Sequence, residues 1–151
     1  MRAVNHALTG ALIGLTVAEP AVAVPAAVVS HYICDVIPHY GSSQKGDTSL
    51  RASSFRSGLY IDAALCLGIV VLLAVRQPSH WLLAAVCAFA AAAPDLLSAN
   101  RYFKVVARKR WQPNLYSRFA TGIQWFERPI GAVVETAWLV ATIIILWPFI
   151  R

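Results

Sequence analysis

Long apolar runs interrupted by few charges are the feature that most constrains the fold of this chain. Of its 151 residues, 58% are hydrophobic and only 13% are charged, whereas soluble domains average about 25% charged residues. The apolar residues fall into five runs, which cover about residues 4–18, 21–37, 58–75, 81–98 and 129–150. These runs predict a single integral membrane domain over residues 1–151, an all-α polytopic bundle of about five transmembrane helices.

The first two runs are short for a membrane span, because a hydrocarbon core of about 30 Å needs roughly 20 helical residues. We expect them to form a thin or re-entrant hairpin that turns at Glu19-Pro20. The first run also has the features of a signal peptide, since Arg2 precedes it and Ala21-Val22-Ala23 is similar to a cleavage site. We favour a retained segment, because His6 and two glycines at helical spacing are unusual in a disposable leader.

The basic residues are divided unequally between the two sides that this topology defines. If all five runs span, the N-terminus and residues 38–57 and 99–128 share one side, which carries 11 of the 13 lysines and arginines. The 11 are Arg2, Lys45, Arg51, Arg56, Arg101, Lys104, Arg108, Lys109, Arg110, Arg118 and Arg128. The positive-inside rule therefore predicts a cytoplasmic N-terminus, and the expected location is a bacterial inner membrane.

The same charges indicate the kind of partner. Basic residues that flank apolar runs are suited to anionic lipid headgroups, so membrane lipid is the expected partner. We do not expect nucleic-acid binding, because no recognition motif accompanies the basic residues. The sequence leaves open whether the chain acts alone or as a homo-oligomer.

The end of the second run carries two imidazoles and a carboxylate at intervals of four residues: His31, Asp35 and His39. On a helix, residues four apart share a face, so His31 and Asp35 are expected to point the same way. Pro38 is expected to end the helix and to let His39 fold back beside them. Such a set suits Zn²⁺, Mn²⁺ or Fe²⁺ and leaves a coordination position open for water or substrate. The alternative is that the two histidines only face lipid headgroups.

The first hairpin brings a third histidine to this set. His6 lies about thirteen residues before the Glu19-Pro20 turn, and His31 and Asp35 lie about eleven and fifteen residues after it. In an antiparallel pair of helices these three side chains meet at one depth. His6 also shares a helix stripe with the Gly10-x3-Gly14 pair, which allows close approach of another helix, so His6 is expected to face protein.

The second hairpin, with its turn at Gln77-Pro78-Ser79, is expected to bring two carboxylates to one depth. Asp62 lies about sixteen residues before this turn, and Asp95 lies about seventeen residues after it. Pro94 cannot donate a hydrogen bond to the carbonyl of Ala90, so the helix end offers a further oxygen to a cation or a donor. We expect Asp95 to complete the metal-ligand set. Asp62 is either part of the site or a headgroup-level carboxylate near a helix N-terminus.

Two connecting segments differ in character. Residues 99–128 are too long for a plain loop, and apolar side chains recur at helical spacing between Leu115 and Phe126. We expect an interfacial helix on the cytoplasmic leaflet, with Asn114 as its N-terminal cap. Residues 40–56 are polar and rich in turn-forming residues, so they are expected to be a connector rather than a lid.

These residues together predict hydrolysis at the cytoplasmic leaflet. A divalent metal lowers the pKa of bound water towards about 7 and polarises a phosphoryl or carbonyl oxygen. The proton of the attacking water would pass to Asp62 or to Glu135, which lies about six residues into the fifth run. Arg101, Lys104 and Arg128 would orient the substrate, a lipid headgroup ester or phosphodiester.

Three stretches resemble a known family. Asn5-His6-Ala7-Leu8-Thr9-Gly10, the His/Asp-rich end of the second run and Pro94-Asp95-Leu96-Leu97 resemble the small membrane-bound metal-dependent hydrolases described alongside LexA-binding inner-membrane proteins. Those proteins have a Pro-Asp-x-Asp motif and a later His-Arg-Gly-x-x-His stretch. Here Leu97 replaces the second Asp, and the later stretch is not present in the sequence. The resemblance implies a metal-dependent hydrolase.

The element His31-x3-Asp35-x3-His39 also looks like the zinc-ligand helix of zinc-dependent phospholipases C. Zn²⁺ is therefore the expected cofactor, with Mn²⁺ and Fe²⁺ as alternatives.

Two other functions stay open. A proton or metal-ion carrier would use the same residues as a relay, although residues 66–93 offer few polar groups towards the far side. A membrane scaffold or assembly protein would hold a structural metal without turnover.

Overall fold

The computed structural model describes residues 1–42 and 47–151. Every regular secondary-structure element in these two ranges is a helix. The prediction of an all-α fold is confirmed for this part of the chain. The helices are α1 (Ala3–Thr16), α2 (Pro20–Val36), α3 (Asp47–Arg51), α4 (Ser53–Arg76), α5 (Trp81–Ala92), α6 (Pro94–Leu97), α7 (Ala99–Val106), α8 (Leu115–Ile123) and α9 (Gly131–Ile150).

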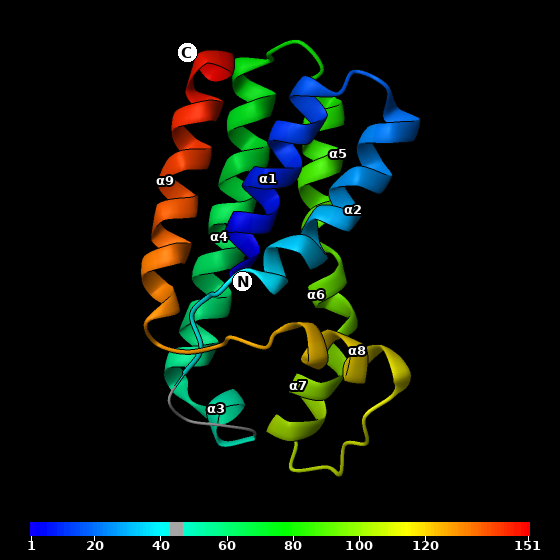
Figure 1. The fold of residues 1–151 in the computed structure, drawn as a ribbon, viewed down its shortest axis with the longest axis vertical. Helices are drawn as coiled ribbons and strands as arrows, with labels where there is room; N and C mark the ends of the chain where they lie inside the picture. The colour runs from blue at the N-terminus through cyan, green and yellow to red at the C-terminus, as the bar shows by residue number, and fades with distance from the viewer. Residues whose placement is uncertain (43–46) are drawn as a thin grey trace.

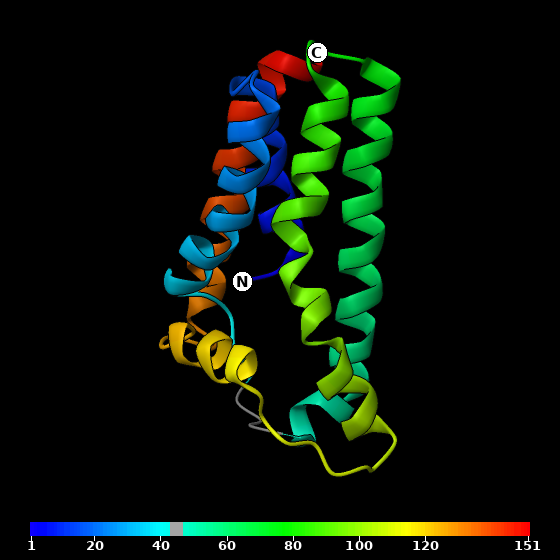
Figure 2. The same cartoon turned by 90° about the vertical axis from the view of Figure 1, so that its right-hand side faces the viewer.

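Helix α1 is the central element of the bundle and contacts α2, α4, α5 and α9. Figures 1 and 2 show that α1, α2 and α9 run from one end of the long axis and that all three stop before its other end. Helix α4 and the series α5, α6 and α7 continue past them to the end that carries α3 and α8 (Figure 1). The start of α1, the end of α2 and the break between α5 and α6 therefore lie partway along the molecule, where the shorter helices stop.

Two glycines allow α1 and α5 to pack backbone against backbone. A Cβ atom built on Gly10 would lie 2.2 Å from the carbonyl oxygen of Cys87, and one on Gly14 would lie 2.5 Å from the Cα of Ala84. The expected close approach at the Gly10-x3-Gly14 pair is thus confirmed, and α5 is the partner helix. The apolar core around this contact consists of Val4, Ala7, Leu8, Ala11, Leu15, Ile69, Leu73, Ala84, Ala88, Leu146 and Ile150.

Two helices, α4 and α9, are long and apolar enough to cross a membrane. A third span results if the α5–α6 segment and α7, which are bent by 42° relative to each other, form one crossing. The expectation of five spans is therefore supported only in part. Helix α1 has 14 residues, so it is only about 21 Å long, and α2 is also shorter than a full span. Their hairpin turns at Glu19, whose side chain accepts a hydrogen bond from the N–H of Ala21.

The connectors contain more helix than expected. Helix α3 lies inside residues 40–56, which were predicted to be a plain connector, and α4 begins at Ser53 rather than near residue 58. Helix α7 likewise precedes the predicted interfacial helix. These short helices are stabilised by tertiary packing, since α3 contacts both α4 and α7 and Val105 of α7 is buried. Helix α8 confirms a helix in its segment with Asn114 as the N-terminal cap, because Asn114 Oδ1 accepts from the N–H of Ser117. Its position on the cytoplasmic leaflet stays a prediction.

The basic residues gather at one end of the molecule. Residues 47–57 and 99–128 lie at or near the end formed by α3, α7 and α8 (Figure 1). The α4–α5 turn, which follows Arg76, and the C-terminal residue Arg151 lie at the opposite end. The charge asymmetry counted along the sequence is therefore also an asymmetry along the long axis of the fold.

Alanine at Gly10 or Gly14 should destabilise the protein, because the added methyl group would collide with the backbone of α5. We expect a loss of about 1–3 kcal/mol for either substitution. Gly68 on α4 is the matched control, since a Cβ there has nothing within 4 Å. Gly68→Ala should be neutral or stabilising by up to about 1 kcal/mol. Thermal unfolding of the detergent-purified variants measures the difference, and equal stability of Gly10→Ala and Gly68→Ala would contradict the packing.

Candidate metal centre

Three ionisable side chains from three helices converge: His6 of α1, His31 of α2 and Asp95 of α6. One ligand atom of each lies within 4.8 Å of the other two. The rings of His6 and His31 are stacked, with centroids 4.0 Å apart, and Nε2 of His31 lies 3.9 Å from Oδ1 of Asp95. Both histidines are buried, whereas the Asp95 side chain is 44% exposed. Asp95 therefore forms the open side of the group.

Asp35 faces both imidazoles at the edge of the stacked pair. Its Oδ1 is 3.2 Å from Nε2 of His6 and its Oδ2 is 3.5 Å from Nε2 of His31. The carboxylate also accepts from the amino group of Met1. We call His6, His31, Asp35 and Asp95 the central cluster. The predicted meeting of these four side chains at one place is present in the structure, and their role as metal ligands stays a prediction.

A hydrogen bond to the backbone orients His31. Its Nδ1 lies 2.8 Å from the carbonyl oxygen of Ala91, and since a carbonyl only accepts, Nδ1 carries the proton. The lone pair of Nε2 is then available on the side of the ring that faces the cluster, the arrangement in which protein histidines bind metals. Ala91 is the next-to-last residue of α5, just before the break between α5 and α6. The carbonyl that Pro94 was predicted to make available is that of Ala90, one residue earlier, and its role stays a prediction.

His6 is fully buried, and neither of its ring nitrogens has a hydrogen bond of acceptable geometry within the described residues. Its Nε2 has only the contact to Asp35 described above. Nε2 of His6 is thus paired only with the Asp35 carboxylate, and a cation held between these two buried groups would satisfy both. Two imidazole nitrogens and carboxylate oxygens are a donor set that fits Zn²⁺, Mn²⁺ or Fe²⁺.

The structure does not bring His39 into this group, although it was predicted to be a ligand. Helix α2 ends before Pro38, as expected. The chain then runs beside residues 126–128, where the N–H of His39 donates to the carbonyl of Phe126 and the carbonyl of His39 accepts from Arg128. The ring is also engaged, because Nδ1 lies 2.8 Å from the carbonyl of Ile37. This backbone pairing holds His39 against the segment before α9, so it does not fold back on the cluster.

The two predicted catalytic bases lie at the N-terminus of α1. The guanidinium Nε of Arg2 lies 3.1 Å from Oδ1 of Asp62, and the backbone N–H of Arg2 donates to Oε1 of Glu135 at 2.6 Å. The first N–H groups of a helix lack intrahelical partners and carry a partial positive charge, which attracts carboxylates. Asp62 and Glu135 therefore help to anchor α1, and a role as base stays a prediction for both.

The predicted headgroup-binding residues also have partners outside the cluster. The guanidinium of Arg101 lies 5.0 Å from the ring centroid of Trp111, and that of Arg128 lies 5.1 Å from that of Phe126. Cation–π contacts of this kind hold long side chains in place. Lys104 lies on α7. The structure thus places all three at the basic end of the molecule, and substrate binding by them stays a prediction.

Two side chains that the sequence analysis did not single out fasten α8 to the centre. Gln124 donates from Nε2 to Oδ2 of Asp35 at 3.0 Å, and Tyr116 donates its hydroxyl to the carbonyl of Pro94 at 2.9 Å. Burial and a hydrogen bond with Tyr32 raise the pKa of the Tyr116 phenol well above its ordinary value, so it remains a donor. Gln124 is 89 residues from Asp35, and neither periodicity nor turn counting relates residues so far apart.

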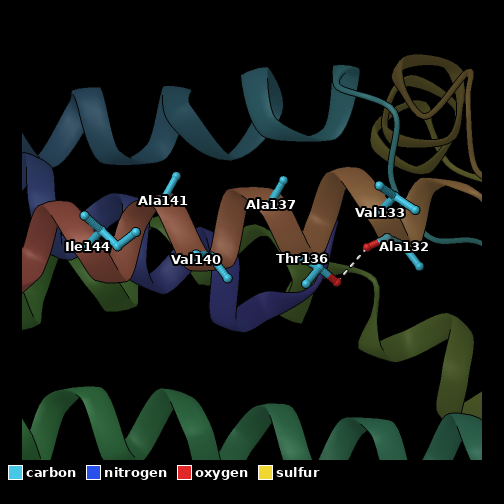
Figure 3. A pocket seen from close by; sticks show the side chains of 7 residues that line it. All are labelled: Ala132, Val133, Thr136, Ala137, Val140, Ala141 and Ile144. Carbon is cyan, nitrogen blue, oxygen red and sulfur yellow. Dashed lines mark hydrogen bonds between the residues drawn. The ribbon is translucent and has the colours of Figure 1, made fainter.

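A groove along the outer face of α9 is a different kind of feature (Figure 3). It has a volume of about 710 Å³ and is lined by Ala132, Val133, Thr136, Ala137, Val140, Ala141 and Ile144. The hydroxyl of Thr136 donates within the helix to the carbonyl of Ala132 at 2.8 Å. The groove therefore offers almost no polar group to a substrate, and we place no catalytic site there.

Substitution of Gln124 should loosen α8 because this side chain ties α8 to Asp35. Gln124→Ala loses a hydrogen bond to a charged group, a loss of about 1.5–3 kcal/mol. Gln124→Glu should have a larger effect, because it would place a second carboxylate beside Asp35. Hydrogen–deuterium exchange over residues 115–123 measures the effect, with exposed Thr121→Ala on the same helix as control. Exchange in Gln124→Glu no faster than in this control would contradict the contact.

No protein-family model, curated protein or solved structure matches this chain. What the protein does must therefore be argued from the chemistry of the centre. That chemistry is defined by two buried imidazoles, one buried carboxylate and one exposed carboxylate, held by the three helices α1, α2 and α6 partway along the bundle.

Proposed function

We propose that this protein is a membrane-embedded, metal-dependent hydrolase that acts on a lipid headgroup ester or phosphodiester. The observation that carries the proposal is the convergence of His6, His31 and Asp95, with Nε2 of His31 available because Nδ1 donates to Ala91. These three residues would hold the ion, with Asp35 as a fourth candidate ligand. Zn²⁺ is the preferred ion, and Mn²⁺ and Fe²⁺ are alternatives. When bound, it would supply a Lewis acid and a water of lowered pKa.

The side chains around the centre support this chemistry in four ways. Nε2 of each imidazole faces Asp35, so one ion would reach both rings and this carboxylate, and the hydrogen bond from Gln124 holds Asp35 in place. Asp95 lies on the exposed side, where a lipid headgroup would enter. Asp62, whose side chain is 15% exposed, is better able to pass a proton to water than the more deeply buried Glu135. Arg101, Lys104 and Arg128 would attract the headgroup from the basic end.

We further propose that the basic end faces the cytoplasm, as the positive-inside rule suggests for a bacterial inner membrane protein with a cytoplasmic N-terminus. Reporter fusions after Gln112, between α7 and α8, and after Pro78, in the α4–α5 turn, should report opposite sides of the membrane. The fusion after Gln112 should be cytoplasmic. If both fusions reported the same side, α4 would not cross the membrane, and the proposed orientation would be wrong.

Metal content tests the centre directly. Detergent-purified protein equilibrated with Zn²⁺ and then desalted should retain about one ion per chain by elemental analysis. His6→Ala, His31→Ala and Asp95→Asn should each lower retention at least about tenfold. His39→Ala should retain the ion, because the structure places this residue outside the cluster, and His80→Asn in the α4–α5 turn is the matched control. Full retention in His31→Ala would rule out the proposed ligand set.

Turnover distinguishes the hydrolase from a scaffold with a structural metal. Burial of His6 and His31, with only one exposed candidate ligand, is the observation that favours the scaffold. Reconstituted protein loaded with Zn²⁺ or Mn²⁺ is incubated with mixed anionic and zwitterionic phospholipids, and released headgroup and fatty acid are measured. Hydrolysis that disappears in His31→Ala supports the enzyme. Stoichiometric metal without consumption of lipid would favour the scaffold instead.

A further inference from the structure

A polar pocket lies away from the central cluster, at the basic end of the molecule. It has a volume of about 220 Å³ and lies between α3, the first turn of α4 and the end of α7. It is lined by Leu50, Arg51, Ala52, Arg56, Tyr102, Val106 and Arg108. A water molecule occupies about 30 Å³ of liquid, so the pocket has room for a group of several non-hydrogen atoms. Three guanidinium groups at one pocket favour an anion.

Contacts between the helices make this pocket a preformed one. Nε of Arg51 donates to the carbonyl of Val105 at 3.0 Å, which ties the end of α3 to α7. The rings of Phe55 and Tyr102 lie 5.7 Å apart and join α4 to α7. Since Arg51 uses only Nε in this bond, its two terminal nitrogens remain donors for a ligand. The arginine is thereby oriented before any ligand binds, which lowers the entropic cost of binding.

The backbone of Arg108 has a conformation that is unusual for an arginine. Arg108 has φ 54°, in the left-handed region that favours glycine. It follows the last turn of α7, where the N–H of Arg108 bonds to Val105 and that of Lys109 bonds to Lys104. This is the helix-ending motif in which glycine normally occupies the position of Arg108. The chain thus has an arginine at a position whose backbone conformation favours glycine, and the side chain of this arginine lines the pocket.

Charge and position indicate the ligand. None of the ion pairs formed by the described side chains involves Arg51, Arg56 or Arg108. Helix α4 has 24 residues and is therefore about 36 Å long, more than the hydrocarbon thickness of about 30 Å. Its first turn, which contains Arg56, thus lies at headgroup depth when α4 spans. At that depth the abundant anions are lipid phosphates.

We propose that Arg51, Arg56 and Arg108 form a phosphate-binding pocket that is separate from the central cluster. Its ligand is the phosphodiester of an anionic phospholipid headgroup or a free phosphate, which present the same oxygens to the three guanidinium groups. The lipid is the ligand that the depth of the pocket favours. Bound there, it holds α3 and α7 against the start of α4.

The test measures binding rather than hydrolysis, so its result is independent of the proposed enzyme activity. Full-length protein in detergent, treated with EDTA, is titrated with short-chain phosphatidylglycerol, short-chain phosphatidylcholine or inorganic phosphate. Native mass spectrometry counts the bound molecules. Arg56→Gln and Arg108→Gly are the pocket variants. Arg110→Gln is the matched control, because it removes the same charge from an exposed arginine that does not line the pocket.

We expect wild-type protein to bind phosphatidylglycerol more tightly than phosphatidylcholine, and each pocket variant to weaken this binding at least about tenfold. Arg110→Gln should bind like wild type. Arg108→Gly should unfold at the same or a higher temperature than wild type, since glycine suits its backbone, so weaker binding would not reflect unfolding. Binding of phosphate alone, lost in the same variants, would identify free phosphate as the ligand. Pocket variants that bind like Arg110→Gln, or wild type that binds neither anion, would overturn the proposal.

Discussion

The backbone contact between α1 and α5 is the interaction on which the rest of this structure depends. Gly10 and Gly14 bring the two helices so close that no side chain fits between them. His6 lies one turn before Gly10 on the same stripe, so the contact that packs the glycines also buries the imidazole. Because α5 breaks just beyond this contact, the carbonyl of Ala91 is positioned for His31. The contact between α1 and α5 therefore positions both histidines.

Once ionisable groups are buried in an apolar bundle, they must pair with one another. The cost of an unpaired charge in such surroundings is several kcal/mol or more. Here α1 begins partway along the bundle, and carboxylates from three other helices meet its first residues: Asp35 of α2, Asp62 of α4 and Glu135 of α9. The amino group of Met1, the guanidinium of Arg2 and the backbone N–H of Arg2 bind these three carboxylates in turn, and the positive end of α1 adds to the attraction. The start of α1 is thus an electrostatic centre that holds four helices in register.

Apolar packing and basic side chains lie at different places along the long axis of the molecule. The part that contains α1, α2 and α9 provides the packing, and the basic end with α3, α7 and α8 provides the arginines and the helix for which we predict an interfacial position. The central cluster lies between the two. A ligand with an apolar tail and a phosphate headgroup has the same division, which is why both the proposed hydrolytic centre and the arginine pocket point to phospholipid chemistry.

The sequence by itself determined the helical class, the close contact at the Gly10-x3-Gly14 pair, and the meeting of His6 and His31 with two aspartates. These features follow from helical periodicity and from distances counted along hairpins, both of which are local rules. Chain counting predicts depth, but it does not predict which way a loop turns or which distant segment it meets. The position of His39 beside residues 126–128, the bond from Gln124 to Asp35 and the pocket of Arg51, Arg56 and Arg108 were decided only by tertiary structure. Each depends on hydrogen bonds and packing between segments far apart in the chain, and no short-range pattern encodes them.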